Sequence, residues 1–233
     1  MMRRTRLLWG AALAGLALAA LLSGRGSAAA SPTGSPWGPD YFPNVPLITQ
    51  DGQTVRFYDD LLKGKAVAIE LIYTSCTDVC PIETGRLRQV QRLLGDRVGK
   101  EIFFYSITID PAHDTPEVLK AYAERFHAGP GWLFLTGKKA DIDLISKKLG
   151  LSSLTDADNR DGHQPSLLLG HEPTGQWMRT SALDNPRFLV VTISHFLGWR
   201  IDRQTRKSYT EARPLTVDEA ERVLRRRLEL GLR

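Results

Sequence analysis

The two cysteines of this chain lie between the end of an apolar segment and the start of a predicted helix. The stretch YTSCTDVCPIETGRL (residues 73–87) contains Cys76 and Cys80, and Pro81 follows directly. Proline is favoured at the first position of a helix. The pattern therefore predicts a strand that ends before Cys76, a short loop, and a helix that begins at Pro81 beside Cys80.

Apolar runs suited to buried strands alternate with helical patterns along the chain. A βαβαβα order is followed by ββα, which with right-handed crossovers gives a mixed sheet covered by helices on both faces. We therefore expect an α/β domain with a thioredoxin-like fold, an extra N-terminal strand near residue 54 and an extra C-terminal helix. The main predicted strands span residues 66–73, 102–109, 132–135, 166–170 and 176–180.

Two of the predicted helices have identifiable start signals. Asp114 or Thr115 is expected to cap a helix that begins at Pro116. Asn185 and Pro186 open an apolar segment that Gly198 can end. This segment is interpreted as a helix, although its LVVTI run also suits a strand.

The first 30 residues have the layout of an export signal. Arginines precede a 16-residue apolar stretch, Leu7 to Leu22, and small residues close the segment. The stretch is longer than a typical signal core and just short of a typical spanning helix. A cleaved signal peptide and a retained N-terminal membrane anchor therefore both remain open for residues 1–30. Either one predicts a periplasmic or otherwise extracytoplasmic protein, attached to the cytoplasmic membrane if residues 7–22 are retained.

Composition divides the remainder into three parts. Residues 31–46 are rich in Pro, Gly and Ser and predict a linker, and residues 47–200 contain the thioredoxin-like domain. Residues 201–233 combine a charged loop with an Arg-rich helix, which a capping box at 216–219 opens.

The formal net charge of +5 does not indicate a nucleic-acid partner. Four arginines and no acidic residues lie in the first 30 positions, and beyond them positive and negative side chains nearly balance. The domain itself therefore has no strong basic character to attract a phosphate backbone.

The chemistry open to the cysteines depends on their spacing and their compartment. Cys80 is expected to be the more acidic thiol, because a helix N-terminus stabilises a thiolate. Outside the cytoplasm such a pair forms a disulfide or is kept reduced for a purpose. Two thiolates suit Cu(I), and an added neutral imidazole also accommodates Cu(II).

His163 is the first candidate for that imidazole ligand. It precedes Pro165 at the entrance of the fourth central strand, and in a thioredoxin-like sheet this segment faces the dithiol. His113 is the second candidate, because it follows a predicted parallel strand at the same edge of the sheet as Cys76. A supporting or capping role for the DPAHDTP segment is the alternative to ligation by His113.

Several segments together resemble the Sco/SenC family: YTSCTDVCP, SITIDPAHDTPEVLKAYAERF, GWLFLTG and a later GH, over roughly residues 40–180. That family consists of thioredoxin-like, exported or membrane-anchored copper proteins that help assemble the copper centre of cytochrome c oxidase. The resemblance implies Cys76 and Cys80 as thiolate ligands and His163 as the imidazole ligand of copper, as Cu(I) or Cu(II). It also implies a copper-receiving oxidase subunit as a partner.

Three functions remain open on these residues. The leading one is a copper-binding metallochaperone, which acts as a carrier rather than a turnover enzyme and depends on an upstream thiol reductant or copper donor. The alternative is an exported thiol–disulfide oxidoreductase that uses Cys76 and Cys80 as a redox-active pair. A peroxide-reducing enzyme is the third, and it gives His163 no role.

Overall fold

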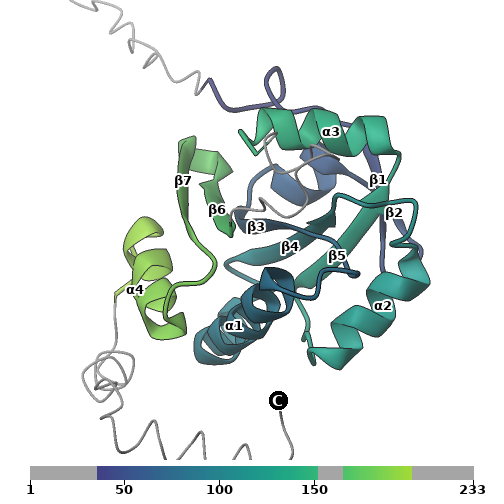
Figure 1. Ribbon diagram of the computed structural model, residues 1–233. Helices are drawn as coiled ribbons and strands as arrows, with labels where there is room; N and C mark the ends of the chain where they lie inside the picture. The colour runs from purple at the N-terminus through teal and green to yellow at the C-terminus, as the bar shows by residue number, and fades with distance from the viewer. Residues whose placement is uncertain (1–35, 152–164, 201–233) are drawn as a thin grey trace, which may run out of the picture. The chain divides into compact units, whose positions relative to one another are not determined.

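The computed structural model describes residues 36–151 and 165–200 (Figure 1). The elements in chain order are β1 (Pro46–Thr49), β2 (Thr54–Arg56), the π-helical segment η1 (Phe57–Leu62), β3 (Ala66–Ile72), α1 (Val79–Leu94), η2 (Gly95–Arg97), β4 (Phe103–Thr108), α2 (Pro116–Arg125), β5 (Trp132–Gly137), α3 (Lys139–Lys148), β6 (Ser166–His171), η5 (Glu172–Thr174), β7 (Gln176–Ser181) and α4 (Pro186–Phe196).

These strands form one mixed sheet of seven strands in the order β2-β1-β5-β4-β3-β6-β7. The central strands β3, β4 and β5 are parallel, while β1, β2, β6 and β7 pair antiparallel. The predicted α/β class and thioredoxin-like strand order are confirmed. An antiparallel pair, β1 and β2, stands where one extra N-terminal strand was expected.

Helices cover both faces of the sheet, and β3 contributes side chains to both cores. All seven residues of β3 are buried. Ala68 and Ile72 pack with residues of α1, α2 and α4, whereas Ile69 packs on the other face with η1 and α3. Figure 1 shows α3 on the opposite side of the sheet from α1. A strand buried on both faces explains the unbroken apolar run in the sequence.

Local boundaries differ from the sequence prediction at two places. Helix α1 begins at Val79, two residues before Pro81, so Cys80 lies inside its first turn. The π-helical segment η1, which the sequence did not predict, follows β2 directly, and its first residues, Phe57 and Tyr58, are buried.

The start signals of two helices are resolved by the structure. Thr115, and not Asp114, caps α2, because its hydroxyl oxygen accepts a hydrogen bond from the Val118 amide. The LVVTI run is helical, within α4, and the Asn185 side chain accepts from the Arg187 amide at its start.

Packing on the domain begins within the segment predicted as a linker. Phe42 is buried and its ring centroid lies 4.7 Å from that of Trp177. Aromatic side chains bury a large apolar area, which explains why this part of a Pro- and Gly-rich stretch packs on the sheet.

No helix among residues 36–151 and 165–200 has the length and apolar character to cross a bilayer. The apolar stretch at 7–22, His163 and the predicted C-terminal helix lie outside the described residues.

Candidate metal and redox site

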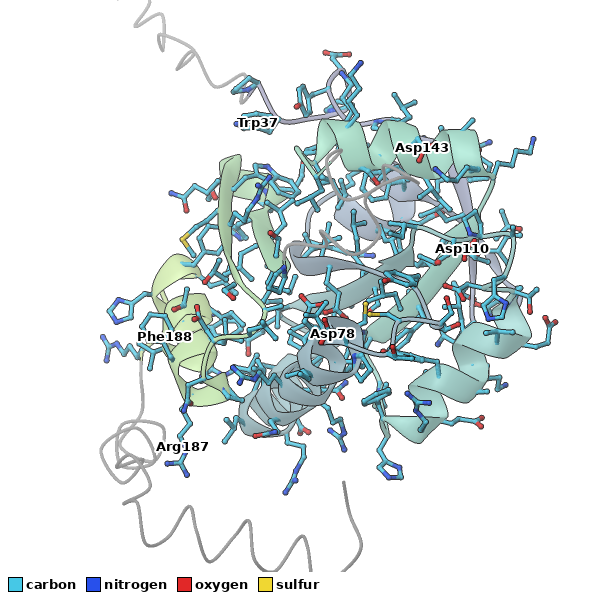
Figure 2. The ribbon with its side chains drawn as sticks, viewed as in Figure 1. Trp37, Asp78, Asp110, Asp143, Arg187 and Phe188 are labelled. Carbon is cyan, nitrogen blue, oxygen red and sulfur yellow. The ribbon has the colours of Figure 1, made fainter. Side chains whose placement is uncertain are left out.

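The two cysteines meet where β3 ends and α1 begins. Cys76 lies in the loop after β3, and Cys80 lies in the first turn of α1, with Asp78 between them (Figure 2). Both are free thiols, and their exposed fractions are 6% and 0%. The Cys80 amide donates to the Cys76 sulfur at 3.4 Å, and the Cys76 amide donates to the Tyr73 carbonyl at 3.1 Å. The loop therefore holds the Cys76 sulfur against the N-terminal turn of α1.

The acidity of the two thiols is the reverse of the sequence prediction. Burial acts to raise the pKa of Cys76, but hydrogen bonds from the Cys80 thiol and from the Cys80 and Asp78 amides outweigh it and lower this pKa below its usual value. Burial raises the pKa of Cys80, and its hydrogen bond to Cys76 raises it further. The prediction that Cys80 is the more acidic thiol was wrong, because the free amides at the start of α1 point at Cys76 and not at Cys80.

A buried carboxyl pair lies between the sheet and α1. Glu70 in β3 and Glu83 in α1 are both almost completely inaccessible to solvent. Glu70 Oε1 accepts a hydrogen bond from Ser106 Oγ at 2.6 Å, and Trp132 Nε1 donates to the same Ser106 oxygen at 2.8 Å. Among the described residues, Glu70 Oε2 has no hydrogen-bond partner.

These surroundings determine the protonation of Glu70. Burial raises the pKa of Glu70 to about 8, the negative charge of Glu83 adds to the rise, and the Ser106 hydrogen bond opposes it only in part. Glu70 therefore keeps its proton at neutral pH. The charge of Glu83 also contributes to the raised pKa of Cys80, after burial and the Cys76 contact.

Sequence reasoning missed this carboxyl pair, although one signal was present. Glu70 is the one charged residue in the strand sequence AVAIELI. A charged side chain in a strand that is buried on both faces is uncommon, because burial disfavours the ionised form.

The structure does not assemble a complete three-residue metal site from the residues that it describes. Over residues 36–151 and 165–200 there is no cluster of three His, Cys, Asp or Glu side chains arranged to hold a metal ion. Exposed His113, the second candidate ligand, is therefore not grouped with Cys76 and Cys80. The first candidate, His163, lies outside the described residues, so its ligation stays a prediction.

The fold and the buried dithiol define a thioredoxin-like protein with two neighbouring free thiols at the junction of β3 and α1. The family model described as SCO1/SenC matches residues 39–182. The chain belongs to the SCO1/SenC family, as its motifs predicted.

Two bacterial relatives have descriptions that bear on this family. A "SCO2-like protein" of Rickettsia felis is 32% identical over 146 residues, which cover 60% of this chain and 68% of the relative. A "Putative copper-binding protein" of Stutzerimonas stutzeri is 31% identical over 131 residues, covering 54% of this chain and 62% of the relative. The matches thus span about two thirds of these two relatives' lengths.

Two solved structures with copper bound share the fold. Yeast Sco1 with copper is 26% identical, has a TM-score of 0.54, and covers 70% of this chain and 97% of its own. Bradyrhizobium japonicum ScoI with copper is 25% identical, has a TM-score of 0.51, and covers 66% of this chain and 99% of its own.

The acidity difference predicts which thiol reacts first with an alkylating agent. In the reduced, metal-free protein at neutral pH, iodoacetamide should modify Cys76 at least about tenfold faster than Cys80, because thiolate fraction and access control the rate. Peptide mass mapping over time measures both rates, and Cys76→Ser and Cys80→Ser provide the single-thiol controls. Faster modification of Cys80 would contradict the assignment.

The protonated state of Glu70 predicts a pH-dependent stability. The pKa of Glu70 is about 8 in the folded protein, whereas the ordinary pKa of a glutamate, expected in the unfolded chain, is 4.5. The folded protein therefore holds this proton more tightly, and the free energy of unfolding should fall as the pH rises from 4.5 to 8. Glu70→Gln keeps an acceptor for Ser106 and removes this loss, so at pH 8 it should raise the free energy of unfolding by a few kcal/mol relative to the parent, with little gain at pH 4.

Urea unfolding at pH 4, 6 and 8 tests this prediction about Glu70. Glu124→Gln, which changes an exposed residue of α2, is the surface control. An equal change in stability for Glu70→Gln at all three pH values would show that Glu70 does not hold a proton in the folded protein.

Proposed function

We propose that this protein binds a copper ion through Cys76, Cys80 and His163 and carries it to a subunit of cytochrome c oxidase during assembly of the copper centre. The observation that carries the proposal is the pair of buried, unpaired thiols at the start of α1. The two solved family structures with copper bound support the same reading of the fold.

The donor chemistry of the pair fits copper. Two thiolates are soft ligands, which favour Cu(I). The lowered pKa of Cys76 makes its thiolate easier to form than that of an ordinary cysteine. Cys80 lies in the first turn of α1 and its amide donates to the Cys76 sulfur, so a single ion can engage both sulfurs. Burial of both side chains limits the access of water and oxidants to the bound metal.

Loading and release follow from the protonation of the thiols. Uptake of Cu(I) requires the loss of one proton from each thiol, and the raised pKa of Cys80 makes its proton the harder one to remove. Protonation of Cys80 therefore favours release of the ion to a partner with better ligands. His163 would supply the nitrogen donor that Cu(II) prefers.

Thiol–disulfide exchange is a second candidate function, and the difference between the thiols favours a definite order of attack. The Cys76 thiolate would attack a disulfide of a partner and release one partner thiolate. Cys80 would then attack the mixed disulfide, release the second partner thiol and leave a Cys76–Cys80 disulfide. Two electrons pass to the partner, and an upstream dithiol reductant restores the pair.

Both functions need a location and partners. We propose that the chain is exported, with residues 7–22 as signal core or anchor, because an oxidising compartment explains the need for a reductant. Its partners are then the copper-receiving oxidase subunit and an upstream thiol reductant or copper donor.

Copper titration of the reduced protein tests the first function. The parent should bind a single copper ion, and Cys76→Ser or Cys80→Ser should abolish tight binding, because one thiolate and one imidazole make a weak site. His163→Ala should weaken Cu(II) binding more than Cu(I) binding, because two thiolates still satisfy the softer ion. His113→Ala is the matched histidine control.

Absorption and competition with a chelator of known affinity measure these effects. Stoichiometric tight binding by either single cysteine variant would contradict the proposed ligands. If His113→Ala lowers Cu(II) affinity and His163→Ala does not, the histidine assignment is wrong.

A further inference from the structure

Asp114 lies in the loop between β4 and α2 with its carboxylate completely buried. One carboxylate oxygen, Oδ2, accepts from the Thr74 amide at 3.1 Å and from the Thr108 hydroxyl. The other, Oδ1, accepts from the Thr74 hydroxyl and, at 3.3 Å, from the Thr74 amide. Asp114 thus joins the cysteine loop to the end of β4.

These contacts hold the carboxylate in one arrangement. A buried charge is strongly unfavourable unless hydrogen-bond donors surround it, and hydrogen bonds to charged acceptors are stronger than neutral ones. The loop that carries Asp114 is itself fixed, because the Asp114 amide donates to the Asp110 carbonyl at 2.9 Å. The Asp110 amide in turn donates to the Thr108 hydroxyl at 2.9 Å, and Figure 2 labels Asp110 on this loop.

The position of Thr74 makes this contact important for the thiols. Strand β3 ends at Ile72, whose carbonyl accepts from the Ile109 amide of the neighbouring segment. Thr74 lies just beyond the sheet, and its amide and hydroxyl both turn to Asp114. Cys76 follows two residues later, and its amide donates a hydrogen bond to the Tyr73 carbonyl. The chain is therefore anchored directly before Cys76.

Asp114 does not cap α2, although the sequence made it one of two candidates for that role. Thr115 caps α2, so the carboxylate of Asp114 is directed to Thr74 and Thr108 instead of the helix start. Loss of Asp114 and loss of the α2 cap can therefore be tested as two separate changes in one loop.

We propose that Asp114 is a positioning residue that holds the Cys76 loop against the start of α1, so that the two thiols are preorganised for each other and for a shared ligand. The role in metal binding rests on the proposed function. The effect on the thiols themselves does not, and it can be measured without metal.

The test measures the equilibrium constant for forming the Cys76–Cys80 disulfide against a glutathione buffer in metal-free protein. Asp114→Ala should lower this constant by about tenfold, because a mobile loop lowers the effective concentration of one thiol near the other. Asp114→Asn, which keeps one acceptor for the Thr74 amide, should recover part of the loss. Thr115→Ala is the matched control, since it removes the cap of α2 and leaves the contacts to Thr74 in place.

The outcomes separate positioning from simple loss of stability. The proposal is supported if Asp114→Ala lowers the constant and Thr115→Ala changes it less than about twofold, while both variants melt at lower temperature. It is overturned if Thr115→Ala lowers the constant as much, or if folded Asp114→Ala leaves it unchanged. If Asp114→Ala does not fold, the disulfide constant of Thr74→Val is compared with that of Thr115→Ala in its place. Thr74→Val removes only the hydroxyl contact to Asp114.

A second readout connects this role to the proposed function. The Cu(II) absorption spectrum of Asp114→Ala should differ from that of the parent, and that of Thr115→Ala should not. If the parent binds no copper, the proposed function fails, and the disulfide constant still decides the role of Asp114. If the parent binds copper and the Asp114→Ala disulfide constant equals that of the parent, only the positioning role fails.

Discussion

The hydrogen bond from the Cys80 amide to the Cys76 sulfur joins the end of β3 to the start of α1. It places the amides of the first helical turn on one sulfur only, which makes the two thiols chemically different. Cys76 becomes the more acidic thiol, and Cys80 keeps its proton under burial and donates to its neighbour. Whether the pair binds copper or exchanges disulfides, this contact sets which thiol is ionised first.

The domain contains two buried acidic features near the dithiol, and it stabilises them in different ways. Asp114 is surrounded by donors from Thr74 and Thr108, which suits a carboxylate. Among the described residues Glu70 accepts from one donor, Ser106, and burial together with the charge of Glu83 raises its pKa. The first arrangement fixes the cysteine loop in place, and the second avoids placing two negative charges together in the core.

Much of the fold could be predicted from the sequence, because buried strands and amphipathic helices leave strong periodic signals. The apolar run of β3 and the helical start at Asn185 and Pro186 are examples, and both were placed correctly. The start of α1 was misplaced, because proline is tolerated throughout the first helical turn and does not mark its first residue alone. Because α1 begins two residues earlier than predicted, its first amides point at Cys76, and Cys76 is the more acidic thiol where the sequence predicted Cys80.

The cysteines of the candidate site were identified from spacing, whereas the residues that support them were not. Asp and Thr are both common helix caps, so sequence alone could not tell that Thr115 caps α2 and that Asp114 turns inward to Thr74. Glu70 and Glu83 lie on different elements, and only the packing of α1 on β3 brings their charges together. The assignment of His163 rests on family resemblance and on the order of the strands.

Copper uptake by the reduced and the oxidised protein tests the central claim most directly. The metal-free protein is oxidised, loss of free thiols is confirmed by a mass tag, and copper binding is measured before and after a reductant is added. If Cys76 and Cys80 are the ligands, the disulfide form should bind no copper tightly, and reduction should restore binding, because only unpaired thiolates can hold the ion. Tight binding by the fully oxidised protein would contradict the account, since it would place the ligands elsewhere in the chain.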